Sequence, residues 1–299
     1  MTDGMAADAL LNRVFNCDVA DLLKELPSNT VHCIFADPDY NVGVRYNDIS
    51  YKKKFNEYID WLGDLCQEFH RVMAPDGNLF VINYPKNNAH LRVRFLDELF
   101  VGVYEYVWVY NTNVGHHPNR FTTAHRTIVH CTKSTKNRFF KAHVAQPYQN
   151  PTDRRIRQNI ANGSPGRMPY SWFYFNLVKN VSKEKTFHSC QIPEKLSESL
   201  IEASTQPGDV VFIPFGGSGA EISVCLRNGR HFIAAEIDPV YYQMILDRIA
   251  REGAIDRKYR LIERIRERKR DGTGVVNQAS QLRLVQEHAE VVYQASPED

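Results

Sequence analysis

The chain has 299 residues, of which 43% are hydrophobic and 24% are charged, and its formal net charge is +2. This length and composition support a real hydrophobic core, which excludes an intrinsically disordered chain. No run approaches the roughly 18 consecutive apolar residues of a membrane span, and the first residues lack a secretory signal pattern, so we expect a soluble, cytoplasmic protein.

Short apolar strands alternate with amphipathic helices towards both ends of the chain. This alternation predicts an α/β fold in which helices cover both faces of a mostly parallel, doubly wound sheet. The predicted strands are 13–16, 31–36, 78–83, 103–110, 126–131, 210–214 and 231–236. The predicted helices are 55–73, which stops at Pro75 and Gly77, and then 194–204, 220–227 and 239–251.

The stretch 135–187 breaks this pattern with the segment NGSPGRMP and few periodic apolar residues, so we predict an insert with long loops. From Lys133 to Lys185, eleven Lys and Arg stand against Asp153 and Glu184, a local excess of +9, and aromatic residues are interleaved. Such a stretch favours contact with a nucleic acid over a merely solvated surface. The candidate DNA-contacting residues are Arg45, Arg120, Lys133, Arg138, Lys141, Arg154, Arg155, Arg157 and Arg167.

The predicted strand 31–36 ends in the sequence DPDY, which is Asp37, Pro38, Asp39 and Tyr40. The simplest interpretation is a polar turn after a buried strand, because Asp and Pro are ordinary turn residues.

The segment VVFIPFGGSG, residues 210–219, predicts a strand that runs into a glycine-rich turn and then a helix. Small residues there let a ligand approach the backbone, and a helix N-terminus favours an anionic group. Twenty positions after Gly216, the next strand ends in Glu236, where a carboxylate can accept hydrogen bonds from both hydroxyls of a ribose. We therefore expect a nucleoside-bearing cofactor. The glycine spacing differs from the G-x-G-x-x-G of nicotinamide enzymes, which disfavours that alternative.

The order of these motifs resembles the β-group amino-methyltransferases of DNA, in which a D-P-P-Y type motif comes first, a target-recognition region follows, and F-x-G-x-G comes last. Here DPDY matches the first motif, 135–187 stands at the recognition region, and HSCQIP at 188–193 resembles the H-P-T-Q-K-P that precedes the last motif. The segment FNCDVADLLKELPSNTVHCIFADPDY also resembles the family's approach to the catalytic strand. The resemblance covers roughly residues 12–252.

This resemblance implies a Rossmann-like methyltransferase sheet of seven strands with a permuted motif order. Residues 1–134 would form the catalytic half, 135–187 the target-recognition insert and 188–253 the cofactor-binding half. Residues 254–299 are predicted to form a tail with helices at 259–270 and 277–293. The tail offers a surface for a homodimer interface or for DNA, and the family implies a bacterial or phage-type protein associated with the nucleoid.

The implied reaction moves a methyl group from S-adenosyl-L-methionine to the exocyclic N6 amine of a flipped adenine in a specific duplex sequence, as in restriction-modification. The Asp37 carboxylate and the Pro38 carbonyl would accept protons of the amine, and Tyr40 would stack on the base. Adenine is favoured because cytosine-N4 enzymes usually carry Ser in place of Asp37. The alternatives are a cofactor- and DNA-binding protein impaired in catalysis by Asp39, a cytosine-N4 or RNA methyltransferase, and a small-molecule enzyme.

The same resemblance assigns the cofactor site. Phe215 would contact the cofactor, Gly216 to Gly219 would lie against its methionine part, and Glu236 would hold its ribose. We expect no metal, because the six cysteines are far apart and form no C-x-x-C pair. The full predicted set is Cys17, Asp18, Asp37, His188, Ser189, Cys190, Gln191, Pro214, Phe215, Gly216, Gly217, Ser218, Gly219, Glu236 and Ile237.

Four positions depart from the family pattern. Asp39 replaces the second proline of the motif and adds a negative charge beside Asp37. Ile192 and Ile213 replace a usual Lys and a usual Asp, which suggests that an ionic contact was exchanged as a unit for an apolar one. Arg126 stands where relatives often carry Glu, and the sequence gives no reason for it.

The site requires two distant segments to meet. Asp37 and Phe215 are 178 positions apart, yet both would follow strands that are neighbours at the switch point of a doubly wound sheet. The loop 41–54, which contains Arg45, is predicted to fold over the cofactor or the flipped base.

Overall fold

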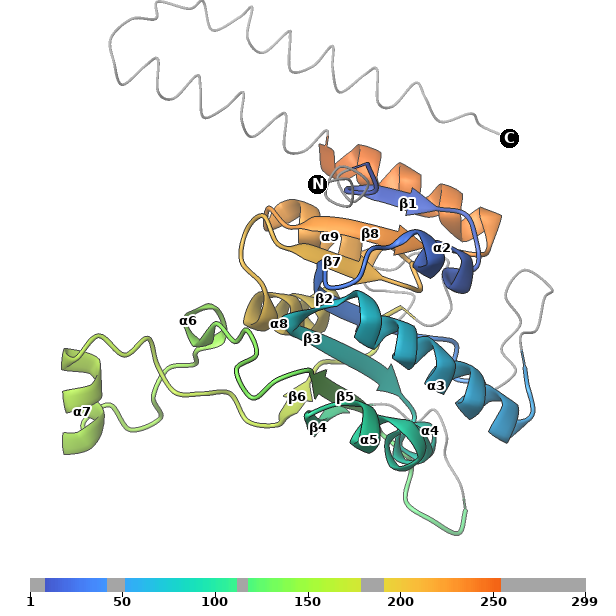
Figure 1. The fold of residues 1–299 in the computed structure, drawn as a ribbon. Helices are drawn as coiled ribbons and strands as arrows, with labels where there is room; N and C mark the ends of the chain where they lie inside the picture. Colours follow the sequence, from blue (N-terminus) through green and yellow to red (C-terminus); the bar gives the residue numbers. More distant parts are fainter. Residues whose placement is uncertain (1–8, 42–51, 112–117, 179–190, 254–299) are drawn as a thin grey trace, which may run out of the picture. The chain divides into compact units, whose positions relative to one another are not determined.

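The computed structural model describes residues 9–41, 52–111, 118–178 and 191–253 (Figure 1). The chain divides into two compact units, residues 1–252 and 253–299, and all described residues except Gly253 belong to the first. The predicted tail helices at 259–270 and 277–293 lie outside the described residues. No helix among the described residues has the length and apolar character needed to cross a membrane.

One sheet of eight strands organises the described residues, in the order β1-β8-β7-β2-β3-β5-β4-β6. The five strands from β1 to β3 in this order run parallel to one another, whereas β5 is antiparallel to both β3 and β4, and β6 is parallel to β4. The predicted α/β fold with a mostly parallel sheet is thus confirmed, with one strand more than the seven expected. The strands are β1 (Arg13–Phe15), β2 (Val31–Ala36), β3 (Met73–Asn83), β4 (Gly102–Val109), β5 (His125–Thr132), β6 (Trp172–Tyr174), β7 (Val210–Ile213) and β8 (His231–Ala235).

The helices follow the predictions closely where their apolar spacing is regular. Helix α3 ends one residue before the predicted end, α8 and α9 have the predicted bounds, and the last predicted helix spans residues 239–253. Shorter helices were not predicted from the sequence. The helices are α2 (Val19–Glu25), α3 (Phe55–Val72), α4 (Pro85–Leu91), the π-helical turn η1 (Arg92–Leu96), α5 (Asp97–Leu99), α6 (Lys141–Val144), α7 (Arg154–Ala161), α8 (Glu194–Ser204) and α9 (Ala220–Arg227).

Two parts of the sheet differ from the prediction. Strand β3 begins at Met73 rather than at residue 78, because Met73 already pairs with Val31 before a register shift that absorbs Pro75 and Gly77. Strand β6 comes from the predicted insert and pairs with β4, with Trp172 opposite Val107. A three-residue edge strand is too short to show a period in the sequence.

Helices cover both faces of the sheet (Figure 1). Alternate strand residues pack into two different apolar clusters, one on each face. On one face, Ile34 and Phe212 pack into an apolar cluster with α2 and α3. On the other face, Cys33 and Val211 pack into a second cluster with α8, α9 and Ile245. This alternation follows from the pleat, which points successive side chains to opposite faces.

The switch point of the sheet lies between β2 and β7. The chain leaves β2 through α3 towards β3, and it leaves β7 through α9 towards β8, which lies in the opposite direction in the sheet. Cys33 pairs with Val211 and Ile34 with Phe212, so the carboxyl ends of the two strands are adjacent. Ligands bind at such a point in doubly wound sheets, because the two departing connections leave a crevice between them.

Candidate active site

A pocket opens at the carboxyl ends of β1, β8, β7 and β2. Its wall is formed by the residues that follow each strand: 17–18 after β1, 37–40 after β2, 214–218 after β7 and 236–238 after β8. The two motifs that are distant in the sequence therefore share one pocket, and this spatial prediction is confirmed.

Most of the predicted cofactor residues line this pocket. Gly219 does not; it is the N-cap of α9 with a φ of 71°, a left-handed conformation that favours glycine. His188, Ser189 and Cys190 lie outside the described residues. The predicted residues in the wall are Cys17, Asp18, Asp37, Gln191, Pro214, Phe215, Gly216, Gly217, Ser218, Glu236 and Ile237.

Several residues of the wall were not predicted from the sequence. Tyr58 and Trp61 come from α3 and are one helical turn apart, which was the only signal that they share a face. Trp61 lies against Phe215, with ring centroids 6.0 Å apart. Glu221 comes from the first turn of α9, and Tyr241 from the helix 239–253. These side chains reach the pocket only because their helices pack beside the strand ends.

Asp37 and Tyr40 form a hydrogen-bonded pair in the wall. The Tyr40 hydroxyl donates to Asp37 Oδ1 over 2.5 Å. Burial raises the pKa of Asp37 to about 8 and is the largest cause, while the hydrogen bond from Tyr40 opposes it. A carboxyl with this pKa is largely protonated at neutral pH, so its capacity to accept protons from a donor increases as the pH rises through 8.

The charges around Asp37 act in both directions. The carboxyl groups of Glu221 and Asp39 raise its pKa, and the Arg126 guanidinium lowers it. Glu221 is itself buried, accepts a hydrogen bond of 2.8 Å from Ser197, and has a raised pKa because of its burial. The replacement of proline by Asp39 thus has an electrostatic consequence at the neighbouring carboxyl.

The backbone after β2 is held from the neighbouring elements. The Tyr58 hydroxyl donates to the carbonyl oxygen of Asp39 over 2.7 Å, and Asn83 Nδ2 donates to that hydroxyl over 2.8 Å. From α4, Asn87 Nδ2 donates to the carbonyl oxygen of Tyr40 over 3.0 Å. Residues 37–40 therefore have a fixed path, set by α3, by the end of β3 and by α4.

Glu236 links the glycine turn to the end of β8. Its Oε2 accepts from the Gly217 amide over 2.7 Å, and its Oε1 accepts from the Asp238 amide over 2.8 Å. Burial raises the pKa of Glu236, and these backbone hydrogen bonds oppose that shift. Each carboxylate oxygen has a second lone pair, so the side chain can still accept two hydroxyl donors from the pocket.

Gly216 is closely packed. A Cβ atom at this position would lie 2.7 Å from Ile245 Cδ1 and 3.2 Å from the carbonyl oxygen of Ala235. The close approach lets the helix that contains Ile245 pack beside the turn.

Lys53 also lines the pocket. Its Nζ lies 5.8 Å from the centre of the Trp61 ring. The Lys53 amide donates to Asn41 Oδ1 over 2.7 Å, and Asn41 Nδ2 donates to the Lys53 carbonyl oxygen over 3.0 Å. Most of the loop predicted to fold over the site, including Arg45, lies outside the described residues.

Ile192 and Ile213, the two departures from the usual Lys and Asp, are both buried in the same apolar cluster. Ile192 also lines the pocket.

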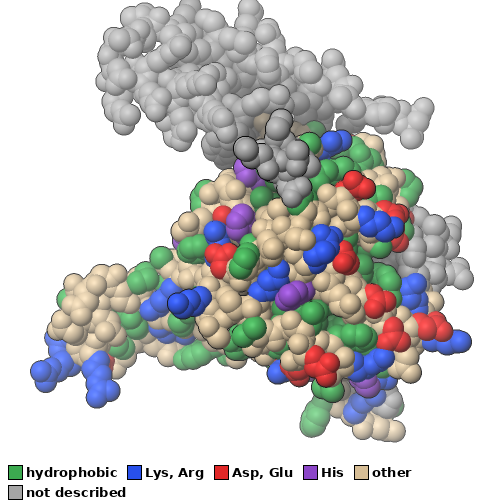
Figure 2. Space-filling view, in the orientation of Figure 1, with side chains coloured by type: hydrophobic (Ala, Val, Ile, Leu, Met, Phe, Trp, Pro, Cys, Tyr) green, Lys and Arg blue, Asp and Glu red, His purple; other side chains and the backbone are tan. Residues whose placement is uncertain are grey.

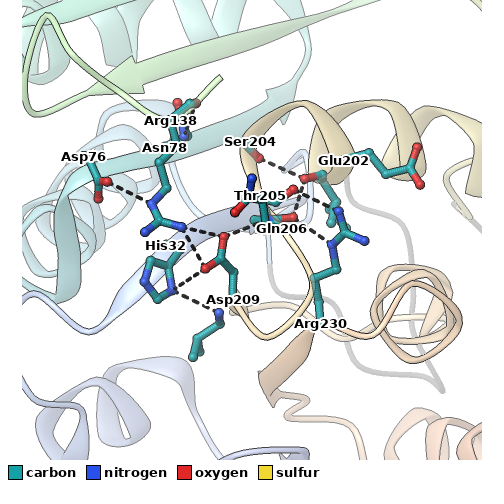
Figure 3. Close-up of polar contacts among 12 residues, drawn as sticks. His32, Asp76, Asn78, Arg138, Glu202, Ser204, Thr205, Gln206, Asp209 and Arg230 are labelled. Atoms are coloured by element: carbon teal, nitrogen blue, oxygen red, sulfur yellow. Dashed lines mark hydrogen bonds and ion pairs between the residues drawn. The ribbon is translucent and has the colours of Figure 1, made fainter. Parts of the chain in front are cut away.

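Two of the predicted DNA-contacting cations bind groups of the protein itself, at the amino ends of the parallel strands and opposite the pocket. Arg138 donates to both carboxylate oxygens of Asp209, at 2.6 and 2.7 Å, and to Asp76 at 2.8 Å (Figure 3). Lys133 donates to the Met73 carbonyl oxygen and to Asn29 Oδ1. Asp209 precedes β7 and Met73 begins β3, so these contacts lie where the parallel strands start, away from the pocket. The side chains of Lys133 and Arg138 are therefore held by groups of the protein itself.

The other cations of the set are placed differently. Arg154, Arg155 and Arg157, the α7 arginines, are exposed on α7, and Figure 2 shows basic side chains gathered over this helix. Arg167 lies over the Tyr170 ring, 4.5 Å from its centre. The remaining described members are Arg120, which is exposed, and Lys141, which begins α6.

Comparison with known proteins gives consistent matches. The model of a DNA methylase family matches residues 31–247. The chain is 30% identical over 246 residues to the type II methyltransferase M.BglII of Bacillus subtilis, covering 77% of this chain and 67% of that protein. It is 28% identical over 241 residues to the DNA adenine methyltransferase YhdJ of Escherichia coli (strain K12), covering 79% and 82%.

Solved structures share the fold. The cytosine-N4-specific PvuII DNA methyltransferase has a TM-score of 0.58 at 20% identity, covering 76% of this chain and 82% of that one. The M1.HpyAVI–SAM complex has a TM-score of 0.57 at 20% identity, covering 79% and 98%.

Proposed function

The chain belongs to the DNA methylase family and uses S-adenosylmethionine, and on this premise we propose that it methylates the exocyclic N6 amine of a flipped adenine in duplex DNA. The observation that carries the proposal is the shared pocket, in which the Asp37–Tyr40 motif faces the glycine turn after β7. A methyl donor held against that turn can thus meet an amine held by Asp37.

The amine needs two acceptors, because its lone pair is delocalised into the ring and it is a poor nucleophile. The Asp37 carboxylate is one acceptor. The Pro38 carbonyl oxygen is the other; it accepts no hydrogen bond from the described residues, whereas the next two carbonyl oxygens in the chain are occupied by Tyr58 and Asn87. Acceptors aimed at the two protons would draw the nitrogen towards a tetrahedral shape and free its lone pair.

The residues of the pocket fit the cofactor. Glu236 keeps lone pairs for the ribose hydroxyls, Phe215 and Trp61 offer aromatic surface, and the small residues Gly217 and Ser218 leave the backbone accessible. A cationic ligand would favour the ionised forms of Asp37 and Glu221 in the wall, whose pKa values are raised by burial. When bound, S-adenosylmethionine supplies an electrophilic methyl group; the protein supplies orientation and the two acceptors.

We infer adenine rather than cytosine from Asp37 at the first position of the motif. The name of one relative, DNA adenine methyltransferase YhdJ, is in line with adenine, whereas the PvuII enzyme of similar fold is cytosine-N4-specific. The base therefore has to be determined on the product.

For DNA contacts we propose the α7 arginines together with Arg120, Lys141 and Arg167. Three exposed aromatic side chains, Tyr170, Trp172 and Tyr174, lie on the same insert, and the first two are stacked with centroids 6.3 Å apart. Cations that contact phosphates give binding that weakens steeply with salt.

A second candidate function is suggested by Asp39, whose charge raises the pKa of Asp37 and so opposes the ionised acceptor. In that case the protein would bind cofactor and DNA with little or no transfer.

The experiment that tests these proposals is incubation with methyl-labelled S-adenosylmethionine and mixed-sequence duplex DNA at pH 8.5, followed by digestion to nucleosides. We expect label in N6-methyl-2'-deoxyadenosine, and none with the Asp37→Ala variant. Label in N4-methyl-2'-deoxycytidine would refute the choice of base. Tight DNA binding without any label would favour the second candidate.

A further inference from the structure

Arg126 is a buried cation enclosed by aromatic rings. It lies at the start of β5 with 8% of its surface exposed. Its guanidinium carbon is 4.7 Å from the ring centres of both Tyr40 and Tyr84, and 5.7 and 5.4 Å from those of Trp108 and Tyr110. Its NH1 group donates to the Tyr110 hydroxyl over 2.7 Å. A desolvated cation over an aromatic face contributes more than an exposed one, so these contacts fix both the cation and the rings.

The position of this cage ties it to the candidate active site. Tyr40 follows β2, Tyr84 follows β3 and Tyr110 follows β4, so three strand ends converge on one guanidinium. Tyr40 is also the donor to Asp37 Oδ1, and its ring packs edge to face against Tyr84 with centroids 5.3 Å apart. One face of the Tyr40 ring is thus covered by the cation, while Tyr40 also lines the pocket.

Arg126 has no carboxylate partner within ion-pair distance among the residues described, and its Nε is buried without a hydrogen-bond partner there. A buried charge without a counterion is costly, so a purely structural role would be served better by a neutral side chain. Its positive charge lowers the pKa of Asp37. The groups that act on Asp37 from the surrounding elements are Tyr40 and Asp39 in its own segment, Tyr58 on α3, Glu221 on α9 and Arg126 on β5.

We propose that Arg126 is a positioning residue for methyl transfer, which fixes the Tyr40 ring and supplies a positive charge that favours the proton-accepting form of the Asp37 side chain. This inference deepens the proposed function and rests on it. It also gives a role to the residue for which the sequence had no explanation. Because Arg126 does not line the pocket, its effect on the reaction is transmitted through Tyr40 and through its electric field.

The first test measures Asp37 directly and needs no activity. Protein labelled with carbon-13 at the aspartate carboxyl carbons is titrated by NMR, and the Asp37 signal is assigned from its loss in Asp37→Asn. Arg126→Met, which keeps an apolar chain in the cage, should raise the Asp37 titration midpoint by about one pH unit or more, since an opposite charge nearby shifts a carboxyl by that order. Arg126→Lys keeps the charge and should leave the midpoint close to that of the wild type.

The second test uses the reaction. A rise of about one unit reduces the ionised fraction roughly tenfold below the midpoint, so Arg126→Met should lose about tenfold in methyl-transfer rate at pH 7.5 and recover most of it at pH 9.5. Arg126→Lys should retain the wild-type pH profile. Cofactor affinity, measured by calorimetry at the higher pH, should not change, which separates positioning from binding.

Arg230→Met is the matched control, because Arg230 is as buried as Arg126, at 7% exposure. It donates hydrogen bonds to Thr205 at the amino ends of the parallel strands, opposite the pocket. The substitution should lower stability without moving the Asp37 midpoint. Arg126→Gln, which keeps a donor for the Tyr110 hydroxyl, serves as the neutral variant if the Met variant does not fold.

An unchanged Asp37 midpoint in the neutral variant, or a rate loss of equal size at every pH, would overturn the proposal. If the midpoint shifts as expected in the neutral variant but the wild-type protein transfers no methyl group, the proposed function is refuted. The effect of Arg126 on Asp37 would then still stand.

Discussion

Replacing Asp37 by Asn should make the protein more stable while it abolishes activity. Burial raises the pKa of Asp37 from an ordinary 3.8 to about 8, so the folded state binds a proton that the unfolded chain has already released. Above pH 3.8 this carboxyl opposes folding increasingly, and the effect levels off above pH 8. Asn keeps the shape of the side chain and removes the ionisation.

The size of the effect follows from the interval between the two pKa values. At about 1.36 kcal/mol per unit, the upper limit is about 6 kcal/mol. The Asp37 side chain is only partly buried and the pocket opens to water, so we halve this figure for solvent screening. We expect Asp37→Asn to gain about 3 kcal/mol in the free energy of unfolding at pH 9 and about 1.5 kcal/mol at pH 6.

The assay is urea unfolding followed by circular dichroism at pH 6 and pH 9. Asp209→Asn is the control with the opposite sign, because Asp209 accepts two hydrogen bonds from Arg138 and its loss leaves that cation with a weaker partner. The reasoning is refuted if Asp37→Asn is no more stable than the wild type at pH 9, or if its gain does not grow with pH.

Further substitutions test the packing and the charge of the molecule. Gly216→Ala should lower the free energy of unfolding in urea by about 1–3 kcal/mol, because its Cβ would meet Ile245 Cδ1 at 2.7 Å. Gly253→Ala, whose Cβ would meet no atom of the described residues within 4 Å, should not. Ile192→Lys should lower the melting temperature and weaken cofactor binding, since it buries an amine in an apolar cluster. Adding Ile213→Asp should recover part of the loss. An unchanged melting temperature of the single variant would count against the coupling between positions 192 and 213. Replacing the three α7 arginines by Gln should weaken DNA binding and flatten its salt dependence in a fluorescence anisotropy titration, and an unchanged salt slope would exclude α7 from phosphate contact.

The elements with regular apolar spacing were predictable from the sequence. Helices α8 and α9 have the predicted bounds, and β2 has the predicted bounds, because long periodic runs bury one face or both. The differences have local causes: β6 is too short to show a period, and β3 begins at Met73, before a register shift that interrupts its pairing with β2.

Some residues of the candidate site were predictable from the sequence and others were not. Asp37 and Glu236 were predictable because each follows a strand and belongs to a motif read along the chain. Trp61, Glu221 and Tyr241 were not, because their approach to the pocket depends on how α3, α9 and the helix 239–253 pack beside the sheet.

The composition of the insert does not predict which of its basic residues are free to contact DNA. The sequence indicated that the insert carries excess positive charge, but it could not separate Arg138, which is paired with Asp76 and Asp209, from the exposed α7 arginines. Pairing depends on carboxylates that are distant in the chain.

Periodicity and motif spacing are properties of neighbouring residues, so the fold class, the order of the motifs and the family resemblance were readable along the chain. The charges that surround Asp37, including the Arg126 guanidinium enclosed by aromatic rings, depend on packing between distant segments. The cage is built from the ends of three different strands, and no local pattern records how a sheet brings such ends together.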